Sequence, residues 1–142
     1  MRFVRNRILR YGLSSQKFLP DFKAKKLLEE KGMVLTERNK NCLFLYNNRE
    51  SMRHWIVKCV VFKILRERER VVGTEIEVDG GIVDVIDVNN FIGYEIESKL
   101  SKKKIEEKVK QFNSLKDVFL IDASKLPDSI KDIEEFLRKK IV

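Results

Sequence analysis

Residues 71–98 read VVGTEIEVDGGIVDVIDVNNFIGYEIES, and this stretch decides the fold. Apolar and polar residues alternate in three short runs, over residues 71–78, 82–88 and 91–97, as they do in β-strands that bury one face. Asp79-Gly80-Gly81 and Asn89-Asn90 separate the runs, and both sequences favour tight turns. The stretch therefore predicts a three-stranded antiparallel meander.

The two turns set the register of this meander, because a two-residue turn fixes which residues face each other across a hairpin. If Asn89-Asn90 is such a turn, Asp84 lies directly opposite Glu95. If Asp79-Gly80 is a type I′ turn, Glu75 lies opposite Asp84 from the other side. Residues two apart on a strand share a face, so four acids are expected to converge on one patch: Glu75, Asp84, Glu95 and Glu97.

The other face of the predicted meander is apolar, as a core requires, and carries Val83, Val85, Ile92, Tyr94 and Ile96. Asp87 falls on that apolar side and is left out of the candidate site. Gly93 is expected to leave the acidic face open beside Glu95, and the strands themselves hold no Lys or Arg to compensate the acids. An alternative stays open, since a solvated face of an amphipathic sheet shows the same alternation.

The acid patch suggests a metal site, because clustered carboxylates repel one another unless a cation or protons compensate them. Carboxylate oxygens suit Mg²⁺, and Mn²⁺ is expected to substitute for it. Such a metal lowers the pKa of a bound water and neutralises charge that develops on a phosphate. We therefore expect Asp84, Glu95 and Glu97 to bind the metal, with Glu75 as an auxiliary ligand or base.

Helical and strand patterns continue around the meander. Ser51 is expected to cap a central helix over residues 52–69, which is apolar over most of its girth. Ser101 can cap a helix that runs to about Asn113, and a short apolar run at residues 118–122 predicts a buried strand. A last helix is expected over residues 129–140. The order from residue 51 is αβββαβα, an α/β fold with a mixed sheet flanked by helices.

The apolar stripes of the last two helices predict which side chains face the core. In the helix that begins at Ser101 they are Ile105, Val109 and Phe112. In the last helix they are Ile130, Ile133, Phe136 and Leu137.

Two sequences within this order of elements are similar to a known family. Ile82-Val83-Asp84-Val85-Ile86 and Tyr94-Glu95-Ile96-Glu97-Ser98 resemble the paired-strand motif of the PD-(D/E)XK nucleases, especially the small archaeal Holliday junction resolvases. The resemblance covers about residues 51–142 and implies a restriction-endonuclease-like core in which Asp84 and Glu95 bind the metal. The family's third motif position is usually Lys, and here it is Glu97.

Two departures from the family motif bear on the site. Glu97-Ser98-Lys99 offers an alternative motif that keeps the lysine, with Lys99 as a charge stabiliser. Val83 stands where the family often has proline.

The resemblance implies a Mg²⁺-dependent endonuclease that hydrolyses phosphodiester bonds of DNA. Junction or other branched DNA is one candidate substrate, and a homodimer is one open arrangement. Two alternatives of other classes remain. One is a catalytically inactive nuclease fold that binds nucleic acid, because Glu97 replaces the usual lysine. The other is an interaction protein whose acids are merely solvated.

The charge balance also points to an anionic partner. The chain has 30 Lys and Arg against 22 Asp and Glu, a net charge of +8, which favours nucleic acid. The alternative is the Lys- and Glu-rich surface of a heat-adapted protein. Four lysines that follow the acid patch are expected to contact phosphates unless they form only a solvated helix end: Lys102, Lys103, Lys104 and Lys108.

His54 and Lys58 lie one turn apart on the predicted central helix. Both residues could flank the substrate groove. The alternative for His54 is a surface or boundary position, which is more common for a lone His near the start of a helix.

Residues 1–50 are expected to form an accessory region beside a core over residues 51–142. It comprises a basic arm, a helix over residues 22–31 between an Asp21 cap and a Gly32 stop, and a hairpin of residues 33–37 and 42–46. Either DNA contact or dimerisation would suit this region.

The remaining composition limits the possible classes. Cys42 and Cys59 are expected to be reduced thiols, since one His and no CxxC leave too few ligands for zinc. No apolar run approaches the roughly 18 residues of a membrane span, and a cytoplasmic location is expected.

Overall fold

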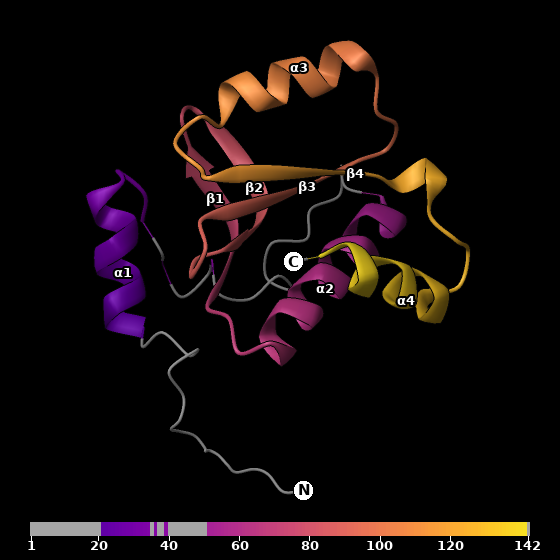
Figure 1. Cartoon of the computed structure of the whole chain (residues 1–142), viewed down its shortest axis with the longest axis horizontal. Coiled ribbons are helices and arrows are strands. Elements are labelled where there is room, and N and C mark those ends of the chain that lie inside the picture. Colours follow the sequence, from indigo (N-terminus) through magenta and orange to yellow (C-terminus); the bar gives the residue numbers. More distant parts are fainter. Residues whose placement is uncertain (1–20, 35, 37–38, 40–50, 142) are drawn as a thin grey trace, which may run out of the picture.

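The computed structural model describes residues 21–34, 36, 39 and 51–141 (Figure 1). From Ser51 onward the elements follow the predicted order αβββαβα, with one short 3₁₀ helix, η4, inserted before the last α-helix. They are α2 (Met52–Glu67), β1 (Val72–Val78), β2 (Gly81–Asp87), β3 (Ile92–Glu97), α3 (Lys102–Gln111), β4 (Asp117–Asp122), η4 (Ala123–Lys125) and α4 (Ile130–Lys140).

The four strands form one mixed sheet, as predicted, and their order in it is β1-β2-β3-β4. The first three are antiparallel, and β4 is parallel to β3 because α3 carries the chain across between them. The first turn has positive φ at both Asp79 and Gly80, as a type I′ turn requires, so that prediction is confirmed.

The second turn differs in detail from the prediction. It spans four residues, 88–91, with the left-handed φ at Phe91 and not at Asn89 or Asn90. Because the turn is still centred on these two asparagines, Val85 pairs with Tyr94 and the predicted register holds.

Serine side chains start all three helices of the core. Ser51, Ser101 and Ser129 each accept a hydrogen bond from the backbone N–H three residues later, at 3.0, 3.1 and 3.1 Å. The helix starts predicted at these serines are therefore confirmed. Helix α2 ends at Glu67, two residues earlier than predicted, because Glu69 adopts a left-handed φ of 59°.

Helices cover both faces of the sheet (Figure 1). On one face α2 and α4 pack against Val85, Tyr94 and Ile96 in one apolar cluster. On the other face the second cluster joins residues at the ends of α1 (Asp21–Glu30) and α3 to the sheet: Leu28, Met33, Phe112 and Leu115 contribute to it. The candidate site lies on the sheet between the start of α2 and the last turn of α3.

The apolar side chains of β1 and β2 change faces midway, contrary to the prediction of one apolar face. Val72 and Val85 pack in the cluster with α2, whereas Ile76 and Val83 pack in the opposite cluster. Strict alternation would put each strand's pair on one face. The change occurs at Glu75, whose φ is +52°, and at its partner position Asp84, where the regular pairing of the two strands is interrupted.

The predicted inward faces of α3 and α4 are correct only in part. Ile105 and Val109 of α3 are 40% and 56% exposed, because only the end of the helix, at Phe112, packs on the sheet. Ile130 and Phe136 of α4 are also exposed. Helix α4 packs on α2 at the border of the sheet, so a narrow stripe suffices, and Ile133 and Leu137 supply it.

The helix predicted near residue 22 is confirmed as α1, in which Asp21 is the first helical residue rather than a cap. Gly32 follows with a φ of +76°, as expected for a helix stop. Met33, Val34 and Thr36 are not in a strand, so the predicted hairpin is wrong at these positions. Of the rest of the predicted hairpin, the structure describes Asn39 alone. Residues 35, 37–38 and 40–46 and the basic arm lie outside the described residues.

Two further findings concern the chain as a whole. Within residues 21–34 and 51–141, no helix combines the length and the apolar composition needed to cross a membrane. Cys59 is half-buried in α2, and Cys42 lies outside the described residues.

Candidate functional site

Glu75, Asp84, Glu95 and Glu97 line one open cavity of about 500 Å³. Strand β1 supplies the first acid, β2 the second and β3 the last two. The remaining wall includes Ser51 and His54 at the start of α2 and Lys108 of α3. The structure therefore brings together the four acids that the register predicted.

The side chains of Asp84 and Glu95 each accept a hydrogen bond from a backbone N–H group of the other residue's strand. The Asp84 backbone N–H donates to Glu95 Oε2 at 2.9 Å, and the neighbouring Ile96 N–H donates to Asp84 Oδ2 at 2.8 Å. These two bonds begin where the regular pairing of β2 and β3 stops, one position beyond Val85 and Tyr94. Hydrogen bonds to the two side chains thus take the place of backbone hydrogen bonds between the strands, and they fix the two carboxylates side by side.

Glu95 is the buried member of this pair, with only 3% of its surface exposed. Burial, followed by the negative charge of Asp84, raises the pKa of the Glu95 carboxyl group to about 7. The Lys108 ammonium acts in the opposite direction but does not offset these two effects. Added positive charge beside Asp84 and Glu95 would therefore be stabilising.

The cations that compensate the acids come from α3, which the sequence argument did not anticipate. Lys108 Nζ lies 2.7 Å from Glu95 Oε1 and 3.5 Å from Glu97 Oε2, and Lys104 Nζ lies 3.0 Å from Glu97 Oε1. The strands hold no lysine for this role, as predicted, but the helix fills it. The spacing of four between Lys104 and Lys108 puts both on one helix face and was the available signal.

Lys108 and Glu95 respond differently to their shared environment. Burial alone would lower the pKa of Lys108, but the hydrogen bond and charge of Glu95, with Glu97, raise it above its ordinary value. Lys108 is therefore charged at neutral pH, whereas the pKa of Glu95 is raised to about 7, first by burial and then by the negative charge of Asp84.

Helix α2 brings His54 and Lys58 to the other side of the cluster. His54 Nε2 lies 3.4 Å from Asp84 Oδ2 and lines the cavity. Lys58 is fully buried, and its ammonium nitrogen lies 4.0 Å from Glu75 Oε2. His54 is a half-buried residue beside the cavity, and its role in flanking a substrate stays a prediction.

Three of the predicted site lysines lie away from the acids Asp84 and Glu95. Lys99 is exposed beyond the end of β3 and does not line the cavity. Lys102 and Lys103 are exposed in the first turn of α3. Asp87 is fully buried and pairs with Arg70 at 2.6 Å, as expected of a residue outside the site.

Gly93 does not leave the sheet open beside Glu95, so that prediction was wrong. A Cβ atom at Gly93 would lie 2.7 Å from Leu115 Cδ1 and 3.1 Å from Val83 Cγ1. Glycine is needed there because the loop after α3 packs directly on the strand.

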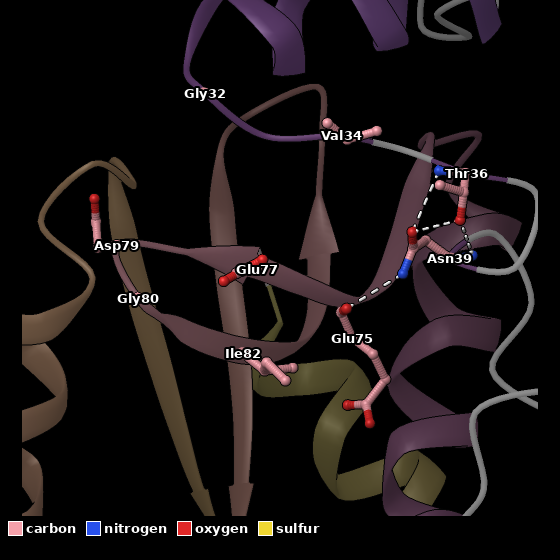
Figure 2. Close-up of a pocket in the computed structure, with 9 residues that line it drawn as sticks. All are labelled: Gly32, Val34, Thr36, Asn39, Glu75, Glu77, Asp79, Gly80 and Ile82. Atoms are coloured by element: carbon pink, nitrogen blue, oxygen red, sulfur yellow. Dashed lines mark hydrogen bonds between the residues drawn. The ribbon is translucent and has the colours of Figure 1, made fainter.

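Asn39 supports the distorted part of β1 from outside the sheet (Figure 2). Its Nδ2 group donates to the carbonyl oxygens of Thr74 and Glu75, at 2.9 and 3.2 Å, and Thr74 Oγ1 donates back to the Asn39 carbonyl. Glu75 separates a second cavity, of about 610 Å³, from the first and lines both of them. The backbone that aims Glu75 is thus held by a residue from before the core.

The acid cluster does not form a complete protein cage for a metal. Among the residues described, no group of three or more His, Cys, Asp and Glu side chains is arranged to hold a metal ion. Asp84 and Glu95 nevertheless fit a hard divalent cation, because Mg²⁺ commonly takes one or two carboxylates from the protein and fills its other positions with water and substrate phosphates. In the structure, Lys108 and Lys104 provide the positive charge instead.

Comparison of the chain with protein-family models, with curated proteins and with solved structures found no match.

Proposed function

We propose that this chain is a metal-dependent nuclease that hydrolyses phosphodiester bonds of DNA. The observation that carries the proposal is the interlocked pair Asp84 and Glu95, two adjacent carboxylates, on a chain with a net charge of +8. Burial, and then the charge of Asp84, raises the pKa of Glu95. A site that needs a cation, set in a chain that attracts anions, suits chemistry on a phosphate.

Asp84 and Glu95 would hold Mg²⁺, and Glu97 lines the same cavity. A bound Mg²⁺ would activate a water and neutralise charge on the phosphate. Glu75, on the opposite wall of the cavity, is the carboxylate suited to accept a proton from the attacking water. His54 lies beside Asp84 and would help to orient the Asp84 carboxylate.

DNA would be held through its backbone by the lysines of α3. Lys102 and Lys103 are exposed in the first turn of α3, the helix that supplies Lys108 to the cavity wall, and lysines bind phosphate as point charges without reading bases. Branched or junction DNA remains the candidate substrate, and a homodimer would present two such sites to it.

The order of elements supports the finer fold assignment within this proposal. An αβββαβα core with a mixed sheet, whose second and third strands supply the acids, is the arrangement that the PD-(D/E)XK resemblance implies for residues 51–142. Residues 1–50 would then be the accessory region.

A second candidate is a DNA-binding module of the same fold without cleavage activity. Glu97 in place of the usual lysine, and the pairing of both Glu95 and Glu97 with lysines, favour this alternative.

A cleavage assay tests the proposal and separates the candidates. The wild-type chain is incubated with four-way junction, duplex and single-stranded DNA in Mg²⁺, Mn²⁺ or EDTA, and binding is followed in parallel. Cleavage in Mg²⁺ or Mn²⁺ that EDTA abolishes supports the nuclease. Salt-sensitive binding with no cleavage in either metal supports the binding module, and neither binding nor cleavage leaves the acids as a solvated face.

A further inference from the structure

Lys108 occupies the place at Glu95 that a metal ion would need. Glu95 has two oxygens, and each already accepts a hydrogen bond: Oε2 from the Asp84 backbone N–H and Oε1 from Lys108 Nζ at 2.7 Å. Because Glu95 is almost completely buried, it has no further exposed edge to offer. The backbone donor is fixed by the sheet, so only Lys108 can give way to a cation.

The same lysine is built to move. It lies in the last turn of α3, a helix with no buried residue of its own among Lys102–Gln111, and its side chain is 25% exposed. Its ammonium group also lies 5.6 Å from the centre of the Phe112 ring, a weak contact compared with the pairing to Glu95. A flexible four-carbon stem allows the ammonium to leave Glu95 by a change of rotamer alone.

A displaced lysine ammonium needs another anion close by. The cavity that Lys108 lines is the one where the proposed function places the substrate phosphate. Lys104, one turn earlier, faces the same side and pairs with Glu97. In the free protein these lysines therefore neutralise the acids. When a cation replaces them there, a substrate phosphate is the anion to which they can bind instead.

We infer that Lys108 couples metal binding to substrate binding: it holds Glu95 in the free protein and transfers to the substrate phosphate when a divalent cation binds Asp84 and Glu95. The inference rests on the proposed nuclease function. Metal and DNA must then strengthen each other's binding by the same factor, because coupling between two ligands is reciprocal. Free protein binds metal weakly, which keeps the site inactive without DNA.

The test is a calorimetric titration with MnCl₂, carried out above the pKa of Glu95. It compares the wild type with Lys108→Met, which keeps the apolar stem and removes the charge, and with Lys108→Gln as a second variant. Lys110→Met is the matched control, since it removes an exposed charge from the same last turn of α3. Each titration is repeated with a four-way junction of phosphorothioate DNA, which resists hydrolysis.

Both Lys108 variants should bind Mn²⁺ more tightly than the wild type without DNA, by about tenfold, a size typical of coupling between ligands. The junction should tighten Mn²⁺ binding in the wild type and in Lys110→Met, and much less in the Lys108 variants. Unchanged or weaker Mn²⁺ binding in both Lys108 variants, in a wild type that does bind Mn²⁺, overturns the coupling alone. A wild type and variants that bind no Mn²⁺, with or without DNA, overturn the proposed function as well.

Discussion

Glu95 is the residue whose ionisation matters most for the folded protein, because it is buried beside a second carboxylate. Its pKa of about 7 lies above the ordinary value of 4.5. Between these two pH values the folded protein binds more protons than the unfolded chain, so the free energy of unfolding must fall as the pH rises. Below about pH 4.5 both states are protonated and the stability is fully retained.

We therefore expect the wild type to lose stability relative to Glu95→Gln as the pH rises from about 4.5 to about 7. The variant keeps the shape and an acceptor for the Asp84 N–H but has no charge to bury. Urea unfolding of both proteins across this range measures the difference. Parallel stability curves would mean that Glu95 ionises as freely in the folded protein as in the unfolded chain.

Glu97 and Lys99 distinguish the two motif readings. Glu97 lines the cavity and contacts both lysines of α3, whereas Lys99 is exposed beyond the strand. Glu97→Gln should weaken Mn²⁺ binding severalfold, because a negative charge is lost near the metal, and Lys99→Ala should change it by less than about twofold. Calorimetry decides between them, and the reverse ranking would favour the Glu97-Ser98-Lys99 motif.

At this scale the sequence predicts the acids but not the cations that meet them. Asp84 and Glu95 follow from alternation and from turns that are local in sequence, so a short stretch suffices to place them opposite each other. Lys108 reaches Glu95 only because α3 lies over β3, and the position of a crossover helix depends on packing far along the chain.

Strand β1 shows the same contrast at the scale of an element. Its limits follow from β-branched residues and from the Asp79-Gly80 turn. The left-handed φ at Glu75 has no local signal, since a non-glycine residue in that region is strained and the sequence does not mark it. Tertiary contacts, including the Asn39 side chain, hold the distortion in place. For this reason the change of faces could not be predicted.

Asn39 should thus stabilise β1 measurably. Asn39→Asp keeps the oxygen that Thr36 N–H and Oγ1 donate to but loses both hydrogen bonds to the Thr74 and Glu75 carbonyl oxygens. We expect a loss of about 1–2 kcal/mol in the free energy of unfolding, at roughly 1 kcal/mol for each hydrogen bond. Thr36→Ala is the control, because it leaves both bonds to β1 intact and should cost less in the same chemical unfolding experiment.

Helices α3 and α4 fall between these cases. Their starts were predictable from Ser101 and Ser129, which cap them locally. Their inward faces were not, because a stripe of apolar residues does not reveal how much of a helix the rest of the molecule covers. Val109 and Phe136 are exposed for this reason.

Across the whole molecule, the net charge of +8 predicts DNA binding that weakens steeply with salt. Each neutralised phosphate contributes about −0.9 to the slope of log K against log salt for duplex DNA. Replacing Lys102 and Lys103 with Ala should reduce that slope by up to about two and leave Mn²⁺ binding unchanged. Fluorescence anisotropy over a salt series measures it.

The control for this prediction is a variant with the same loss of charge on the other side of the sheet, Lys131→Ala with Lys139→Ala in α4. Its slope should stay close to that of the wild type. Equal slopes in all three proteins would show that Lys102 and Lys103 make no phosphate contact, and equally reduced slopes in the two variants would show that only the net charge matters.

The proposed metal site, formed by Asp84 and Glu95, is tested most directly by comparing three conservative variants in one cleavage assay. Asp84→Asn and Glu95→Gln keep size and hydrogen-bond acceptors but remove a ligand charge, whereas Glu77→Gln changes an exposed acid of the same hairpin that does not line the site. With Mg²⁺ and junction DNA, the first two should lose activity by at least about 100-fold while circular dichroism stays that of the wild type, and Glu77→Gln should cleave normally. Wild-type cleavage by Asp84→Asn or Glu95→Gln would contradict the proposal that these two residues bind the metal.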